Sequence, residues 1–256
     1  GLGDVYKRQT CYMFNHRPNS LNAGSLWGRP FYILREAWNI LNAIAEGKIE
    51  SGDEKKLNAL KGETMAVIAL CQFDLTRCFG YPYTKDNGAS LGAPLIDHLV
   101  GTYENPSRST VAQAYDFIIE TLEEAVTLMS EEKNNGRMNK YAARALLARV
   151  YLYHNDNRKA FDMAEQLIKD VDASGSYALY PHEKYVAAWS VETKFGSESF
   201  FEIANSVDDT PGRDSWGYLL NWYGYQKGFV TQKYAEQMLA DPGDVRGQLL
   251  EENKYA

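Results

Sequence analysis

The sequence predicts a mainly α-helical protein, built from antiparallel helical hairpins that are joined by long irregular loops. Apolar residues recur every three to four positions through much of residues 26–170. Residue types that start and end helices bracket these stretches. Beyond residue 170 glycine, serine, proline and tyrosine become frequent and the helical period fades. We therefore expect a helical scaffold over about 26–170 and a loop-rich, ligand-side region over about 171–256.

The first two expected helices form one hairpin. The first covers 26–46, where Pro30 suits an early helical position and Gly47 suits the C-terminal cap. Ser51 and Glu54 form a capping-box pattern ahead of a second helix, which runs to about residue 79. The expected buried residues of the two helices are Phe31, Leu34, Trp38, Leu41 and Ile44, then Ile68, Phe73, Leu75 and Phe79.

Three more helices are expected between residues 110 and 170. Thr110 and Gln113 form a capping box before a stripe that consists of Tyr115, Ile118, Leu122, Val126 and Met129. The next helix, 139–154, carries small residues at Ala142, Ala145 and Ala148. A tight polar turn at 155–157 leads into the last, whose stripe consists of Ala160, Phe161, Ala164, Leu167 and Ile168. Residues 197–206 suit a short strand, and 231–239 suit a terminal helix.

A long loop over 80–106 interrupts this helical pattern. It contains Pro82, Pro94 and Pro106 with several glycines, so it cannot continue the helix that precedes it. A structureless stretch of this length inside a compact domain is usually functional. We hypothesise that the loop packs against the rest of the domain or faces a partner protein. An inert packed excursion is the alternative.

Composition and charge exclude several classes of function. The net charge is −7 and basic residues do not cluster, so nucleic acid and anionic lipid are not expected as partners. No stretch approaches the ~20 apolar residues that a membrane span requires. Cys71 and Cys78 lie two helical turns apart, too far for a disulfide, and are expected to be core thiols.

The two ends of the sequence suggest that it is part of a longer protein. Residues 1–9 resemble a translated sequencing-adaptor scar, and we leave them out of the functional argument. The last residues, "EENKYA", carry no terminal signal. The expectation is a partial domain over 10–256 that is truncated at both ends.

The fourth and fifth expected helices resemble a tetratricopeptide repeat. In "ALLARVYLYHNDNRKAFDMAEQLI" the small residue Ala148 precedes Tyr151 by three, and Ala160 and Ala164 follow the turn. The second and third expected helices resemble another such pair, opened by the long loop. Stacked helix pairs bury a continuous core and leave a curved outer surface. Taken alone, this resemblance implies a scaffold for protein–protein interaction.

A larger set of blocks resembles the SusD/RagB family of outer-membrane nutrient-binding lipoproteins. The most specific pieces are "FDLTRCFGYPY" followed by "LGAPLI", and "GRMNKYAARALLARVYLY". The similarity spans most of residues 26–229. It implies the SusD-like α/α superhelix, with tetratricopeptide hairpins as scaffold and irregular segments that form a sugar site.

The resemblance also implies a function and a location. Family members bind oligosaccharide without cleaving it, at the surface of the outer membrane, and cover a SusC-like TonB-dependent transporter. A lipid anchor on an N-terminal cysteine holds them there. Cys11 lacks a preceding apolar segment, so the expected anchor is missing from this chain, together with a large C-terminal portion.

The strongest candidate sugar site is the aromatic segment 210–228. Sugar rings have apolar faces and rims of hydroxyls, so they are bound by flat aromatic rings together with amide, carboxylate or guanidinium groups. The segment combines Trp216, Tyr218, Trp222 and Tyr223 with Arg213 and Asn221. The alternative is that several of these rings fill the core.

Trp27 is a second candidate, because it stands in a Gly/Ser/Pro setting just ahead of the first helix. The family resemblance there is one of position only. Trp38 and Trp189 are expected to pack in the interior instead.

Enzymatic functions find little support in the sequence. His16, His98, His154 and His182 are scattered without metal or triad spacing, and a capping role at a helix end is expected for His154. A glycosidase needs two carboxylates about 5–10 Å apart across a cleft, and no pair is marked out. We expect no catalytic residue, no metal and no cofactor. A helical protein–protein scaffold and a hydrolase remain as alternatives to glycan binding.

Overall fold

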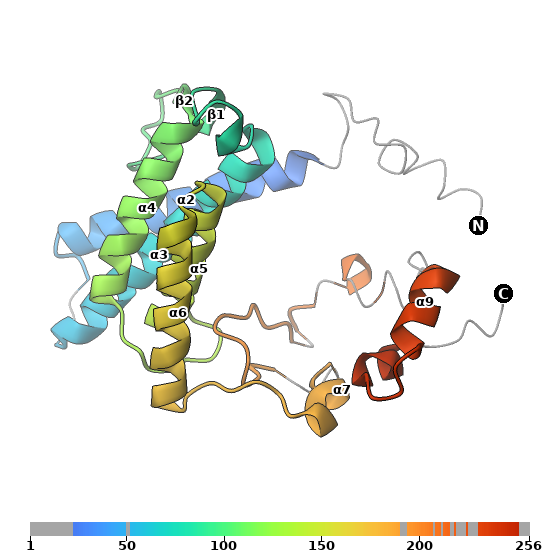
Figure 1. Ribbon diagram of the computed structural model, residues 1–256. Helices are drawn as coiled ribbons and strands as arrows, with labels where there is room; N and C mark the ends of the chain where they lie inside the picture. The colour runs from blue at the N-terminus through green and yellow to red at the C-terminus, as the bar shows by residue number, and fades with distance from the viewer. Residues whose placement is uncertain are drawn as a thin grey trace. The chain divides into compact units, whose positions relative to one another are not determined.

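The computed structural model describes residues 23–49, 52–189, 194–206, 208–210, 212–215, 218, 224 and 230–250. Within them the chain is mainly helical, as predicted (Figure 1). The α-helices are α2 (Gly24–Ala45), α3 (Glu54–Phe79), α4 (Val111–Leu128), α5 (Lys140–Tyr153), α6 (Asn157–Ser174), α7 (Tyr185–Ala188) and α9 (Gln232–Leu239). The strands are β1 (Leu91–Pro94) and β2 (Arg108–Thr110). Short 3₁₀ turns are η2 (Tyr83–Lys85), η3 (His182–Lys184), η4 (Gly212–Asp214) and η5 (Val245–Leu249).

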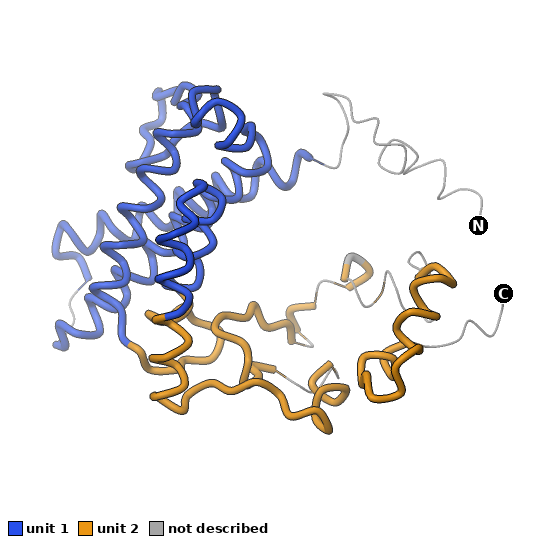
Figure 2. The backbone as a smooth tube through the Cα atoms, in the orientation of Figure 1, with its two compact units in different colours: residues 1–130, 143–165 blue, residues 131–142, 166–256 orange. Residues whose placement is uncertain are grey.

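The chain divides into two compact units (Figure 2). Unit 1 comprises residues 1–130 and 143–165, and unit 2 comprises residues 131–142 and 166–256. Each unit is described by itself.

The core of unit 1 is formed by α2, α3 and α4, with α3 packed against both of the others. Leu34 and Ala37 of α2 meet Ile68 and Leu75 of α3 in one buried cluster. Phe31, Trp38, Leu41 and Phe79 pack against this cluster from its margin. The apolar spacing therefore identified the inward faces of both helices.

Local capping chemistry fixes where these helices begin and end. Thr110 and Gln113 form the predicted capping box of α4, and Gly80 ends α3 as predicted. Gly47, at φ 68°, follows the end of α2. The cap of α3 was misplaced: Asp53 accepts from the backbone N–H groups of Lys55 at 3.0 Å and Lys56 at 3.3 Å.

Pro30 also lies further inside its helix than predicted. Helix α2 begins at Gly24, so Pro30 lies in its second turn. An upstream extension of this kind is not signalled by any capping side chain, since Ala23 at the N-cap makes no side-chain hydrogen bond.

The long loop contributes one strand to a small antiparallel sheet that the sequence did not predict. β1 pairs with β2, with Leu91 opposite Thr110 and Pro94 opposite Arg108. The guanidinium of Arg108 donates from Nε to the Gly92 carbonyl at 2.6 Å, which reinforces the pairing. Ala93 belongs to the core cluster that α2 and α3 share. The hypothesis that the loop packs against the rest of the domain is therefore confirmed.

The α5–α6 hairpin has the turn that the sequence predicted. Asn155 adopts φ 70°, and Asp156 accepts from the N–H of Lys159 at 3.2 Å. Tyr151, 4% exposed, donates its hydroxyl to Glu123 of α4 at 2.5 Å. This tyrosine thus fills the gap between hairpins, as the tetratricopeptide resemblance implied.

Several burial predictions were wrong. Phe161 is 58% exposed and Ile168 is 61% exposed, whereas Leu167 beside them is buried. Cys78 is exposed because it lies in the last turn of α3, and Trp189, the residue that follows the four-residue helix α7, is 68% exposed. In each case the side chain has apolar character but stays largely open to solvent.

Unit 2 is organised around Tyr177, which is 5% exposed. Its hydroxyl accepts from the Asn139 side chain at 2.8 Å, and its ring meets the rings of Tyr141 and Phe200 edge-on. Lys133 lies over the same ring and donates to the carbonyls of Phe195 and Gly196 at 3.2 and 3.0 Å.

The strand predicted over 197–206 is not formed in the described residues of that segment. Its polar groups are used otherwise: the Glu202 carboxylate accepts from the N–H of Phe195, and the Ser197 carbonyl accepts from Ala178. The terminal helix was predicted correctly, since Thr231 caps α9 through the N–H of Tyr234 at 3.3 Å.

Candidate functional site

The predicted aromatic segment 210–228 belongs to unit 2. Trp216, Asn221, Trp222 and Tyr223 lie outside the described residues, so their place in the site stays a prediction. Arg213 lies in η4 and is exposed, and its role in binding also stays a prediction.

Tyr218 is half-buried, and its backbone N–H donates to the Ser215 hydroxyl at 3.1 Å. This side-chain-to-backbone bond stabilises a local turn. Tyr218 therefore has a defined position within the segment, with part of its surface open.

Trp27 forms a ring platform at the start of α2 in unit 1. It meets Phe31 edge-on at a centroid distance of 5.1 Å and Phe79 at 4.8 Å. It remains 37% exposed. Edge-to-face contacts of this kind hold a ring in place. Trp27 is thus a partly exposed aromatic surface with little freedom to turn, which suits the stacking role predicted for it.

Tyr81 is an exposed aromatic residue that was not singled out from the sequence. It directly follows Gly80 and is 57% exposed. The Lys85 ammonium lies 3.0 Å from its ring centroid, a cation–π contact. One face of this ring is therefore occupied by the protein itself. In the sequence, Tyr81 and Pro82 directly follow the glycine that ends the helix. This pattern could have indicated an exposed aromatic residue at the start of the loop.

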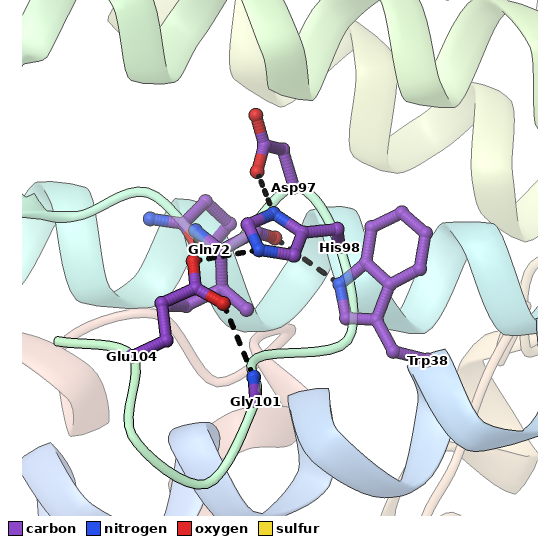
Figure 3. Close-up of polar contacts among 7 residues, drawn as sticks. Trp38, Gln72, Asp97, His98, Gly101 and Glu104 are labelled. Carbon is purple, nitrogen blue, oxygen red and sulfur yellow. Dashed lines mark hydrogen bonds and ion pairs between the residues drawn. The ribbon is translucent and has the colours of Figure 1, made fainter. Parts of the chain in front are cut away.

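Two helices fasten the long loop through side-chain hydrogen bonds (Figure 3). Gln72 of α3 is fully buried; its Nε2 donates to the Pro94 carbonyl at 3.1 Å and its Oε1 accepts from the Ile96 N–H at 3.3 Å. The indole N–H of Trp38 in α2 donates to the Ile96 carbonyl at 3.2 Å. The loop backbone thus finds inside the protein the partners that a strand or water would otherwise supply.

The next turn of the loop holds an imidazole between two carboxylates (Figure 3). His98 Nδ1 lies 2.6 Å from Asp97 Oδ1, and Nε2 lies 2.8 Å from Glu104 Oε1. The other oxygen of Glu104 accepts from the Gly101 N–H at 3.1 Å. We call Asp97, His98 and Glu104 the loop clasp.

The hydrogen bonds to both carboxylates of the clasp raise the pKa of His98. The bond to Asp97 has the larger effect and the bond to Glu104 the next largest. The pKa of Glu104 is lowered by the Gly101 N–H and then by His98. The two carboxylates approach opposite nitrogens of the ring, so they do not converge on one point as metal ligands would.

The capping role predicted for His154 is wrong. Its ring packs against the rings of Tyr83 and Tyr115, at centroid distances of 4.2 and 5.6 Å. The Nδ1 atom of His154 is buried without a hydrogen-bond partner. Tyr115 is 3% exposed, and burial raises its pKa to about 12. These rings therefore form a packed aromatic cluster in which the Tyr115 phenol stays protonated.

Two carboxylates of α4 have structural partners. Glu124 pairs with Lys61 at 3.0 Å, and Glu123 accepts from Tyr151. Among the residues that the structure covers, no group of three His, Cys, Asp or Glu side chains is placed to hold a metal ion. The chemistry on offer in these residues is ring stacking and hydrogen bonding.

The chain belongs to the SusD-like family. Residues 5–152, more than half of the chain, match the family described as "Starch-binding associating with outer membrane". The predicted family and fold class are thereby confirmed. No curated protein matches the chain.

Two of the solved structures that resemble this chain come from Bacteroides species. A SusD superfamily protein from Bacteroides vulgatus is 95% identical over 98% of this chain, with a TM-score of 0.91. A SusD superfamily protein from Bacteroides thetaiotaomicron is 34% identical over 89% of this chain, with a TM-score of 0.79. A laminarin-binding SusD-like protein is 22% identical over 85% of this chain, with a TM-score of 0.63, and shows the fold alone.

The chain spans only about half the length of these structures. It covers 56% of the first, 50% of the second and 44% of the third.

Proposed function

We propose that this chain is part of a cell-surface protein that binds oligosaccharide and delivers it to a SusC-like TonB-dependent transporter. The observation that carries the proposal is membership of a family described as starch-binding and associated with the outer membrane. The fold shared with a laminarin-binding protein gives further support.

Binding would rest on stacking and hydrogen bonds, with no covalent step. Trp216, Trp222, Tyr218 and Tyr223 would supply the aromatic faces, and Arg213 and Asn221 the polar contacts. Trp27, whose ring is fixed and partly exposed, would supply a second platform. The protein would release its ligand unchanged, so it would not be an enzyme.

The proposed location is the outer surface of the outer membrane, where the family associates. None of the helices formed by the described residues is both long and apolar enough to cross a bilayer. A lipid anchor in the longer protein would supply the attachment.

Polysaccharide-affinity electrophoresis tests the proposal. Migration of the chain is compared in gels with and without starch, laminarin and a wider glycan panel. We expect retardation by at least one glycan, reduced in Trp216→Ala and Trp222→Ala. Trp189→Ala is the matched control, because Trp189 is 68% exposed and lies outside the predicted site.

A helical scaffold for protein–protein interaction is the alternative function. The α5–α6 hairpin and its Tyr151 contact favour it, because tetratricopeptide pairs build such scaffolds. A folded chain that no glycan retards would support the scaffold. Release of reducing ends from a retarding glycan would contradict both functions and indicate a hydrolase.

A further inference from the structure

Unit 1 contains a hollow of about 250 Å³ between α2, α3 and α4. Trp38 of α2 and Phe117 of α4 supply aromatic walls, and Ile68 of α3 is its most deeply buried lining residue. Glu120 and Glu124 of α4 also line it. The hollow is distinct from the predicted aromatic segment and has no role in the proposed glycan site.

The apolar part of the hollow is held in place. The indole N–H of Trp38 is bonded to the Ile96 carbonyl at 3.2 Å, which fixes the plane of the ring (Figure 3). Phe117 packs at the margin of the core cluster that contains Ile68. An occupant would therefore meet a preformed aromatic and aliphatic surface.

The charged part of the hollow is incompletely neutralised. Glu120 and Glu124 are four residues apart on α4, where like charges repel one another. Lys61 pairs with Glu124 at 3.0 Å. Glu120 makes no hydrogen bond or ion pair with any of the described residues. Glu120 is exposed, so water solvates its carboxylate in the free chain and a cation from outside has access to it.

The hollow is large enough to hold a single long side chain. Pockets for whole small molecules usually measure about 300–1,000 Å³, whereas this hollow measures about 250 Å³. An arginine side chain combines a planar cation that stacks on aromatic rings with a fork that matches a carboxylate. Its apolar stem would lie along Trp38 and Phe117.

We propose that this hollow is a docking site for an arginine side chain of a partner protein, with Trp38 and Phe117 flanking the guanidinium and Glu120 pairing with it. The charge complementarity of Glu120 selects a basic partner. The proposal is independent of glycan binding, since it uses none of the residues assigned to sugar.

The test is an NMR titration of the 256-residue chain, which observes the Trp38 indole N–H and the Thr121 amide. The probe is N-acetyl-arginine methylamide, and its neutral isostere N-acetyl-citrulline methylamide is the ligand control. We expect saturable shifts at both positions with the arginine probe and at least fivefold weaker binding of the citrulline probe.

Two variants test whether the guanidinium of the probe pairs with the Glu120 carboxylate. Glu120→Gln should weaken binding of the arginine probe at least fivefold. Glu54→Gln, the same change of charge at an exposed residue in the first turn of α3 and away from the hollow lining, should leave it unchanged.

Several outcomes would overturn the proposal. They are an absence of shifts at Trp38 and Thr121, equal binding of both probes, and unaltered binding in the Glu120 variant. Shifts at these positions caused by starch or laminarin oligosaccharides, and not by the arginine probe, would assign the hollow to sugar instead.

Discussion

The loop clasp specifies a protonation state through geometry. Asp97 and Glu104 approach different nitrogens of His98 at 2.6 and 2.8 Å. A neutral imidazole donates from only one nitrogen, so only the imidazolium satisfies both carboxylates. Protonated His98 thus connects the two ends of the turn 97–104.

The clasp makes this turn sensitive to pH. The pKa of His98 is raised above its ordinary 6.5, so the clasp contributes fully below about pH 6.5 and is lost as pH rises through the raised value. The pKa of Glu104 is lowered from 4.5, so its contribution is present above that value and is lost as pH falls through the lowered one. The clasp is therefore strongest between these two limits.

NMR titration of the His98 ring protons measures this effect directly. We expect a midpoint above 6.5 in the native chain and a lower one in Glu104→Gln. The Gly101 amide, which donates to Glu104, should exchange faster with solvent above the midpoint. A native midpoint at or below 6.5 would show that the clasp does not form.

At the scale of elements, the close approach of α3 and α4 depends on Gly62. A Cβ at this position would lie 2.7 Å from Met129 Cγ and 2.9 Å from the Ala125 carbonyl oxygen. The second of these is backbone, so a helix would have to shift. By contrast, a Cβ added at Gly28 in α2 would have no neighbouring atom within 4 Å.

Alanine at these two helical glycines should have opposite effects on stability. Gly62→Ala should lower the free energy of unfolding by about 1–2 kcal/mol, because overpacking outweighs the gain in helix propensity. Gly28→Ala should raise it by about 0.5–1 kcal/mol through propensity alone. Urea unfolding measures both changes. Stabilisation by Gly62→Ala would contradict the close helix contact.

Gln72 connects α3 to the long loop, and its removal should loosen that loop. Gln72→Leu leaves the Ile96 N–H and the Pro94 carbonyl without this partner, at a cost of about 2–4 kcal/mol in unfolding free energy. Urea unfolding and the rate of proteolysis within residues 97–106 report the effect. Gln166→Ala, an exposed glutamine in α6, is the control and should change stability by less than about 0.5 kcal/mol. Unchanged stability and proteolysis in Gln72→Leu would contradict the anchoring role.

The start of α4 was predictable because its capping chemistry is local. Thr110 and Gln113 satisfy one another's backbone within four residues, so the sequence alone shows the cap. The β1–β2 pairing joins residues 14 to 19 positions apart, Pro94 with Arg108 and Leu91 with Thr110, and depends on packing that spacing does not show. The role of Gln72 was missed for the same reason.

Apolar spacing predicted which side of a helix is apolar but not whether that side is covered. Leu34 and Ile68 are buried because another helix lies against them. Phe161 has equally suitable spacing and is 58% exposed, and Arg158 of the same helix lies over its ring at 5.8 Å from the centroid. Coverage is a property of the whole fold, so a single helix does not reveal it.

At the scale of the molecule, charge and composition restrict the classes of ligand that the chain is expected to bind. A net charge of −7 disfavours polyanions, whereas uncharged sugars are indifferent to it. Trp27 was predictable as a candidate from its Gly/Ser/Pro setting, and the structure adds the rings of Phe31 and Phe79 that fix it. The clasp was not predictable, because Glu104 reaches His98 only through the shape of the loop.

Isothermal titration calorimetry tests glycan capture by aromatic rings most directly. An oligosaccharide of the best-retained glycan is titrated into the native chain, into the double variant Trp216→Ala/Trp222→Ala and into Trp189→Ala. We predict saturable heat for the native chain and the Trp189 variant, and at least tenfold weaker binding for the double variant. Equal affinity in all three would contradict the assignment of sugar binding to segment 210–228.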